Sequence, residues 1–205
     1  MGNAALAIAV AVLAAAGVFL VVILLRKYRK PPMDNDNPLN GLMGLLKEIQ
    51  TCDDAGATSA TAVMVYVGID VMARLSMSAT KDSATRKDFI AWVDKYLKAA
   101  PGSEYEYEGK EVYAARCGMV HTYGTEADLH KEDQNLKQFG YHDGGQHRFN
   151  PAISTTLVVI GIKSLVHDFL RAVEAFVNDM RADADLRQRV AARLPKIVAV
   201  FPLHE

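Results

Sequence analysis

An arginine and a histidine, Arg116 and His121, stand in the middle of the chain with four residues between them. A neutral imidazole can accept a hydroxyl proton near neutral pH, and an imidazolium can give a proton to a leaving oxygen. A guanidinium can bind a phosphate through two parallel hydrogen bonds and stabilise the charge that builds on its oxygens. Together the two side chains are suited to cleavage of a ribose phosphodiester with the 2′-hydroxyl as nucleophile.

This pair lies in an expected helix that begins near Glu108 and ends at Gly124, a residue type that commonly terminates helices. Five helical steps turn the chain by about 140°, so the two side chains do not stack as an i, i+4 pair would. We expect them to converge on one cleft when this helix end packs against a second copy of the chain. The alternative is structural: Arg116 pairs with an acidic residue, and His121 stabilises the helix C-terminus.

Apolar residues recur at helical spacing through most of the chain after residue 38. The segment Ala57–Met77 is apolar on nearly all sides, which indicates a central helix that its neighbours cover. Within it, Asp70 and Arg74 stand four residues apart and are expected to pair. The other expected helices are Leu39–Asp53, a helix capped by Asp82 or Ser83 that ends before Pro101, Leu165–Met180, and Asp185–Arg193.

The stretch Thr125–Asn150 has a different, polar pattern. Asp143-Gly144-Gly145 lies there between short segments that carry aromatic residues, which favours a small β-hairpin. Leu157–Ile160 can form one more short strand. No internal repeat is visible. The sequence therefore predicts a mainly α-helical bundle over residues 39–205 with a small β-hairpin insertion.

The segment Arg116-Cys117-Gly118-Met119-Val120-His121, in a helix that follows two apolar helices, resembles the R-x4-6-H motif of HEPN-domain proteins. The resemblance covers roughly Leu39 to Arg181. It implies a helical domain that dimerises with its two motifs at the interface, and metal-independent endoribonuclease activity carried by Arg116 and His121. Active members often place Asn directly after the arginine, where this chain has Cys117. The resemblance also implies a toxin-like or anti-phage effector, which a signal or a regulatory partner protein controls.

Several tyrosines lie near the motif and are candidates for binding an RNA base. Tyr113 precedes the motif and Tyr123 follows it, and aromatic rings of this kind stack on the bases of single-stranded RNA. Tyr105 and Tyr107 could stack in the same way. The alternative for such tyrosines is packing inside the helical core.

The remaining histidines do not predict a metal site. His142 and His147 flank the Gly-Gly turn and His130 lies upstream, but a further ligand would have to converge on them. Neither Cys52 nor Cys117 has a second cysteine at a metal-binding spacing. We therefore expect solvent-exposed loop histidines, reduced thiols, and neither a metal nor a cofactor.

The N-terminal part differs in composition from the rest of the chain. No Lys, Arg, Asp or Glu occurs before Arg26, and Ala4–Leu25 is an uninterrupted apolar run of 22 residues. As a helix it reaches about 33 Å, enough to span a bilayer. The basic cluster Arg26–Lys30 follows this run, which favours an uncleaved anchor over a signal peptide. By the positive-inside rule, everything after the cluster lies on the cytoplasmic side of an inner membrane.

The charge of the cytoplasmic part limits the partners it can bind. Without the four cations of the basic cluster, 19 of the 23 basic residues remain against 24 acidic residues. A broad phosphate-binding surface is therefore excluded, and any contact with RNA must be local.

Taken together, these patterns predict a membrane anchor at residues 1–30, a polar linker at 31–38 and a helical domain at 39–205. The leading function is RNA cleavage by a homodimer. Two alternatives stay open: a non-catalytic membrane-tethered module that binds a partner or a nucleotide, and an effector that disrupts the membrane through its anchor.

Overall fold

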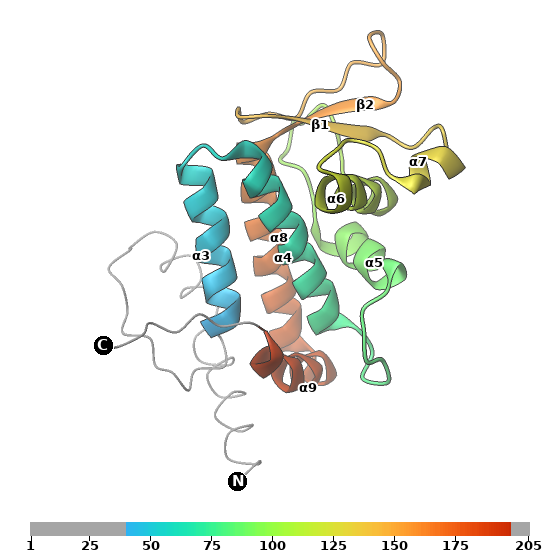
Figure 1. The fold of residues 1–205 in the computed structure, drawn as a ribbon. Coiled ribbons are helices and arrows are strands. Elements are labelled where there is room, and N and C mark those ends of the chain that lie inside the picture. The colour runs from blue at the N-terminus through green and yellow to red at the C-terminus, as the bar shows by residue number, and fades with distance from the viewer. Residues whose placement is uncertain (1–39, 198–205) are drawn as a thin grey trace.

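The computed structural model describes residues 40–197, so the predicted anchor at Ala4–Leu25 and the linker at residues 31–38 lie outside the described residues. Within this range the chain folds into seven α-helices, one 3₁₀ turn and a two-stranded sheet (Figure 1). The prediction of a mainly helical fold with a small β element is confirmed. The helices are α3 (Asn40–Asp54), α4 (Thr58–Ser76), α5 (Arg86–Tyr96), α6 (Gly109–Thr122), α7 (Asp128–Glu132), α8 (Ile162–Ala182), α9 (Ala184–Arg193) and the 3₁₀ turn η1 (Leu194–Lys196).

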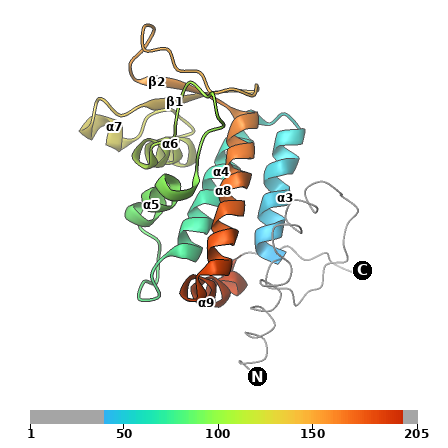
Figure 2. The same ribbon diagram turned by 180° about the vertical axis from the view of Figure 1, so that it is seen from behind.

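Helix α4 is the central helix, as its apolar sequence predicts. Helices α3, α5 and α8 all pack against it, and its Val65, Tyr66 and Ile69 are fully buried. Figures 1 and 2 show α3, α4 and α8 lying side by side, with α9 across one end of the bundle and the sheet at the other. Gly68 allows α4 and α8 to approach closely, because a Cβ there would stand 2.5 Å from the ring of Phe169.

Within residues 40–197, α4 is also the one helix that is long and apolar enough to cross a membrane. Half of this segment is buried inside the bundle. Its neighbours cover it on several sides, so its apolar character is explained by its place in the core.

Helix α5 begins later than the sequence indicates. Its first residue is Arg86, so the predicted cap at Asp82 or Ser83 is wrong. The physical reason is Asp88, whose carboxylate accepts hydrogen bonds from the Thr85 backbone N–H at 2.8 Å and the Thr85 hydroxyl at 2.6 Å. The Lys81 ammonium lies 2.6 Å from the same carboxylate. These contacts fix the start of the helix.

We expect Asp88→Ala to lower the free energy of unfolding by about 1 kcal/mol at neutral pH, because the cap is lost. Burial of the carboxyl opposes its ionisation, yet the hydrogen bonds from Lys81 and Thr85 lower the pKa of Asp88 to about 2. The unfolded-state pKa is near 4, so the cap stabilises fully above about pH 4 and weakens as the pH falls toward 2. Urea unfolding of both proteins at pH 7 and pH 3 measures this; an equal difference at the two pH values would contradict it.

The two strands, β1 (Gln138–His142) and β2 (Leu157–Gly161), pair in parallel, with Gly140 opposite Val159. The predicted hairpin is therefore wrong, although the predicted strand at Leu157–Ile160 is confirmed. After the turn that follows β1 the chain does not return along β1. It reaches the far edge of β2 instead, where Arg148 and Val159 exchange two backbone hydrogen bonds in an antiparallel bridge.

The histidines on either side of this turn explain the path of the chain. The His142 ring closes the loop on itself, since its Nδ1 accepts from the Gly144 N–H at 3.0 Å and its Nε2 donates to the Gln146 carbonyl at 2.8 Å. His147 is 1% exposed and lies against Asp168 of α8. The chain thus enters the core directly after the turn, and the expectation of an exposed His147 is wrong.

Candidate functional site

Arg116 and His121 contact each other within one chain. The Arg116 Nη1 atom lies 3.1 Å from the His121 Nε2 atom, near the end of α6. The helical geometry separates the two positions around the helix axis, but the long arginine side chain spans that distance. A second copy of the chain is therefore not needed to bring the pair together, and this part of the sequence-based expectation is wrong.

Asp70, on the central helix α4, is the third member of the site. Its Oδ2 atom accepts from the Arg116 Nε at 2.9 Å and lies 2.8 Å from the Arg116 Nη2. The expected pair between Asp70 and Arg74 is wrong, because Asp70 faces α6 and holds its arginine. Burial raises the pKa of the Asp70 carboxyl, against the opposing effect of the Arg116 guanidinium. Helix α4 thus fixes the position of the Arg116 guanidinium through Asp70.

Donor and acceptor roles define the protonation of His121 in this arrangement. A guanidinium has five N–H donors and no acceptor, so the His121 Nε2 atom must accept the bond from Arg116. The imidazole is then neutral, with its hydrogen on Nδ1. Three guanidinium N–H groups face Asp70 and His121, and the side chain of Cys117 interacts with the same guanidinium. The side chain of Arg116 is 21% exposed and His121 is exposed, so solvent reaches the pair.

The four tyrosine candidates lie in different surroundings. Tyr105 and Tyr107 are each 5% exposed in the core, which excludes them from stacking on a base. Tyr113 is half-buried, and its ring packs edge-on against Phe89 with centroids 5.3 Å apart. Tyr123 is 69% exposed, directly after α6. Of the tyrosines proposed to bind bases, Tyr123 is the one that presents its ring to solvent.

The end of α6 has an unusual backbone. Tyr123 adopts φ 53° and ψ 32°, the left-handed conformation that was expected at Gly124, and it is the one non-glycine residue with positive φ in the described part of the chain. Its N–H donates to the Met119 carbonyl, and the Gly124 N–H donates to the Gly118 carbonyl, both at 3.2 Å. These two bonds close the helix directly after His121.

Gly118 lets the chain that follows α6 fold back onto the helix. A Cβ at this position would lie 2.8 Å from the carbonyl oxygens of both Gly124 and Glu126. The Thr122 hydroxyl also donates to the Gly118 carbonyl at 2.8 Å. The glycine therefore belongs to the turn that places His121, rather than to a contact between helices.

We expect Gly118→Ala to destabilise the fold by about 1–3 kcal/mol through overpacking against fixed backbone. This loss outweighs the gain of about 1 kcal/mol that alanine brings inside a helix. The matched control is Gly44→Ala on α3, where nothing lies within 4 Å of the added Cβ. Urea unfolding should show Gly44→Ala unchanged or stabilised. Equal effects of the two substitutions would contradict the proposed role of Gly118.

A second polar cluster lies inside the domain, between α8 and the part of the chain that carries β1 and β2, residues 138–161, here called the β segment. The Gly161 N–H donates to the His147 Nδ1 at 3.2 Å, so the ring hydrogen sits on Nε2, which faces the Tyr107 hydroxyl at 2.6 Å and Asp168 at 3.2 Å. Arg171 adds a bond of 2.9 Å to the other Asp168 oxygen. His147 and Asp168 are each at most 1% exposed. This cluster satisfies buried polar atoms and has no access for a substrate.

His130 has a structural role as well. Its Nδ1 accepts from the Ala127 N–H at 3.0 Å, and its Nε2 lies 3.2 Å from the Lys137 carbonyl. It is 8% exposed, so the expectation of an exposed loop histidine is wrong here too. Among residues 40–197, no group of three or more His, Cys, Asp or Glu side chains is close enough to hold a metal ion. Both cysteines in this range are free and half-buried.

Comparisons of the chain with protein-family models, with curated proteins and with solved structures each gave no match. The site combines a solvent-accessible imidazole with the guanidinium that bonds its Nε2 atom and that a carboxylate holds from a second helix. Asp70 could not be assigned from sequence spacing, because its contact depends on how α4 and α6 cross.

Proposed function

We propose that this chain is a membrane-anchored, metal-independent endoribonuclease that acts as a dimer at the cytoplasmic face of an inner membrane. The observation that carries the proposal is the 3.1 Å contact between Arg116 and the exposed His121, with the guanidinium held by Asp70. A side chain suited to phosphate binding and a side chain suited to proton transfer therefore lie side by side at the surface. These are the two functions that cleavage of RNA without a metal requires.

The reaction follows from the roles of these atoms. A phosphate oxygen takes the N–H group of Arg116 that bonds the His121 Nε2, and the released Nε2 then accepts the proton of the adjacent 2′-hydroxyl. The 2′-oxygen then bonds to phosphorus while the bond from phosphorus to the 5′-oxygen breaks. The leaving oxygen takes a proton from the His121 of a second copy, which enters the reaction with a proton taken from solvent on its Nε2 and without its bond from Arg116. The products are a 2′,3′-cyclic phosphate and a 5′-hydroxyl.

Apolar exposure beside the motif supports the dimer. Val120 is 36% exposed and Tyr123 is 69% exposed, and they stand on either side of His121 in the sequence. The proposed dimer contact would cover the exposed part of Val120. An anchor at Ala4–Leu25 would confine two copies to one plane and raise their effective concentration, so that a weak contact could be switched by clustering. A toxin or anti-phage effector under a regulatory partner would use such a switch.

The alternative function is a non-catalytic, membrane-tethered binding module. The specific observation in its favour is the ion pair between Asp70 and Arg116, which links α4 to α6 and would serve the fold without any reaction. Under this alternative the same exposed surface around His121 would bind RNA or a partner and leave it intact.

An assay on the full chain in phospholipid vesicles separates the two functions. Single-stranded RNA is incubated with the protein in EDTA, and both binding and product formation are followed. The endoribonuclease predicts fragments that end in a 2′,3′-cyclic phosphate. Binding of RNA that stays intact, with a protein shown to be dimeric, would support the module and overturn the proposal.

We expect Tyr123→Gly to separate stability from RNA binding. Glycine adopts the left-handed conformation without strain, so the free energy of unfolding should rise by about 1 kcal/mol. Loss of the exposed ring should weaken binding of single-stranded RNA by roughly five-fold or more, since one base stack contributes about 1–3 kcal/mol. Thermal unfolding and RNA titration measure the two effects. Unchanged RNA affinity would remove Tyr123 from the binding surface.

A further inference from the structure

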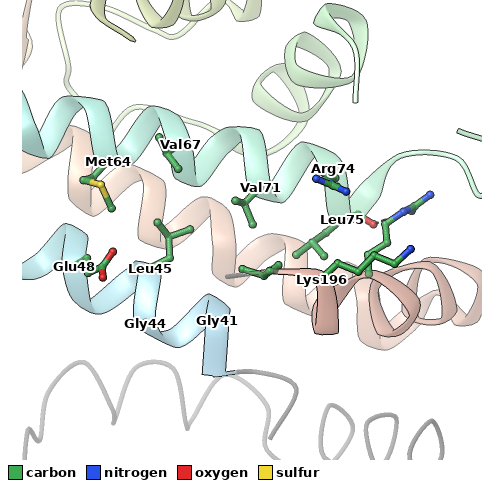
Figure 3. Close-up of a pocket in the computed structure, with 12 residues that line it drawn as sticks. Gly41, Gly44, Leu45, Glu48, Met64, Val67, Val71, Arg74, Leu75 and Lys196 are labelled. Atoms are coloured by element: carbon green, nitrogen blue, oxygen red, sulfur yellow. Dashed lines mark hydrogen bonds between the residues drawn. The ribbon is translucent and has the colours of Figure 1, made fainter. Parts of the chain in front are cut away.

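A groove lies between α3 and α4 and is closed at one end by η1. It encloses a cavity of about 320 Å³, within the size range of small-molecule sites. Leu45 of α3 faces Val67 and Val71 of α4 across it (Figure 3), so its middle is apolar. Its floor is continuous with the core, but its α3 wall includes Gly41 and Gly44 and therefore presents few side chains.

Positive charge gathers at one end of this groove. Arg74 and Lys196 line that end, whereas the one acidic lining residue, Glu48, lies at the other end beside Met64 (Figure 3). Arg193 also lines the groove, and its bonds to the Met77 and Ser78 carbonyls place it just beyond the end of α4, near Arg74. No carboxylate in the described part of the chain forms an ion pair with any of these three cations. An apolar channel with an unneutralised cationic end is complementary to an amphiphile with an anionic head.

The fixed position of Arg193 shows that this end is built into the fold. Its guanidinium donates to the Met77 and Ser78 carbonyls, each at 2.7 Å, at the end of α4. Burial, with the neighbouring charges of Arg189 and Arg74, lowers the pKa of Arg193. The positive charges of Arg193, Arg189 and Arg74 therefore repel one another, and an anion bound between them would reduce that repulsion.

We propose that the groove between α3 and α4 binds an anionic phospholipid of the membrane surface, with an acyl chain along Leu45, Val67 and Val71 and the phosphate at Arg74 and Lys196. The site is separate from the Arg116–His121 pair and does not depend on RNA cleavage. It would set the orientation of the domain on the membrane.

The groove lies close in sequence to the predicted membrane anchor, as binding of a membrane lipid requires. Its α3 wall is formed by the first turns of the described chain, from Gly41 to Glu48. The eight residues of the linker, 31–38, precede it and reach at most about 28 Å when extended. A membrane surface at the end of the predicted anchor would therefore lie within reach of the groove. Anionic lipid there attracts each nearby cation.

The chain offers a substitution that fills the groove without disturbing its walls. Gly44 lines the groove, and a Cβ there would have no atom within 4 Å, so Gly44→Leu can begin a side chain at the groove without a clash. Leucine is also a better helix former than glycine, so the fold should be unchanged or more stable. A second variant, Arg74→Gln with Lys196→Gln, removes two of the three cations at that end. Its matched control is Lys87→Gln with Lys131→Gln, two exposed cations on α5 and α7.

The test is photo-crosslinking of the full chain in phosphatidylcholine vesicles. One sample contains a minor fraction of phosphatidylglycerol with a photoactivatable acyl chain. A parallel sample contains the same fraction of phosphatidylcholine with that photoactivatable chain. Labelled peptides are mapped by mass spectrometry. We expect phosphatidylglycerol to label the groove at Leu45, Met64 or Val71 and phosphatidylcholine to label it several-fold less. Gly44→Leu should abolish this labelling.

The charge substitutions complete the test. Removal of Arg74 and Lys196 should lower the labelling by roughly five-fold for each charge, and the Lys87 and Lys131 control should leave it unchanged. No labelling of the groove in the wild-type chain would overturn the proposal, as expected if the chain's own residues fill it. Equal labelling by both lipids, or labelling that survives Gly44→Leu, would overturn it as well.

Discussion

His121→Ala should lower the rate of RNA cleavage by about 10²–10⁴-fold, the usual contribution of a general base or acid. Alanine removes the imidazole that is proposed to accept the 2′-hydroxyl proton, while the Asp70 carboxylate stays bonded to Arg116. The Arg116 guanidinium would remain, still held by Asp70, so RNA affinity should change little. Cleavage rates at saturating RNA in EDTA, together with RNA titrations, measure the two effects. A loss of rate without a loss of binding is the signature of a catalytic residue.

The matched control for this variant is His167→Ala. His167 is an exposed histidine on α8, outside the site, and its replacement should leave the rate unchanged. Because His121 is exposed, its own replacement should change the free energy of unfolding by no more than about 0.5 kcal/mol. Full activity of His121→Ala would contradict the proposed mechanism. An equal loss of rate in both variants would show that the effect is not specific to His121.

Arg116→Lys should lower the cleavage rate by about 10²–10³-fold although it keeps the charge. The lysine ammonium is a point charge, and it cannot bond Asp70 and His121 while it also presents two parallel donors to a phosphate. The Asp70–Arg116 pair is partly exposed, so the change in the free energy of unfolding should stay near 1 kcal/mol or less. Cleavage rates and urea unfolding measure these two effects.

Arg148→Lys is the corresponding control, since Arg148 lies on the β segment and is 60% exposed. It should cleave RNA at the wild-type rate. If Arg116→Lys also kept the wild-type rate and only lost stability, the guanidinium would serve as a link between α4 and α6. The binding module would then be the better account of the chain.

Local sequence patterns were sufficient for most of the helical fold. The apolar spacing in α3, α4, α8 and α9 follows from each helix burying one face, or nearly all faces for α4, and that spacing is visible in the sequence. The start of α5 was missed because two residues of similar capping ability stand close to Thr85. The hydrogen bonds from Thr85 to the Asp88 carboxylate are what make Thr85 the cap in place of Asp82 or Ser83.

The β segment shows where local patterns fail. The Gly-Gly turn between aromatic residues is a good hairpin signal, yet the chain enters the core at His147 because Asp168 and Tyr107 provide hydrogen-bond partners there. Those partners come from α8 and from the loop before α6, so no window of the sequence around His147 contains them. Burial of a polar residue depends on partners that the sequence does not place nearby.

The sequence predicted only part of the candidate site, for the same reason. The types of Arg116 and His121 suggested the RNA cleavage that we propose, but their direct contact depends on the length of the arginine side chain. The role of Asp70 depends on the crossing of two helices. Of the tyrosines, Tyr123 could be recognised as exposed only once the end of α6 was known.

Replacement of one ribose by deoxyribose in the RNA shows whether the 2′-hydroxyl is the nucleophile. The full chain in vesicles is incubated in EDTA with an all-ribose oligonucleotide, and with the same oligonucleotide carrying a single 2′-deoxynucleotide on the 5′ side of the mapped cleavage position. The account predicts cleavage of the first to a 2′,3′-cyclic phosphate and no cleavage of the second at that position, with equal binding of both. Intact all-ribose RNA, or cleavage that persists beside the deoxynucleotide, would contradict it.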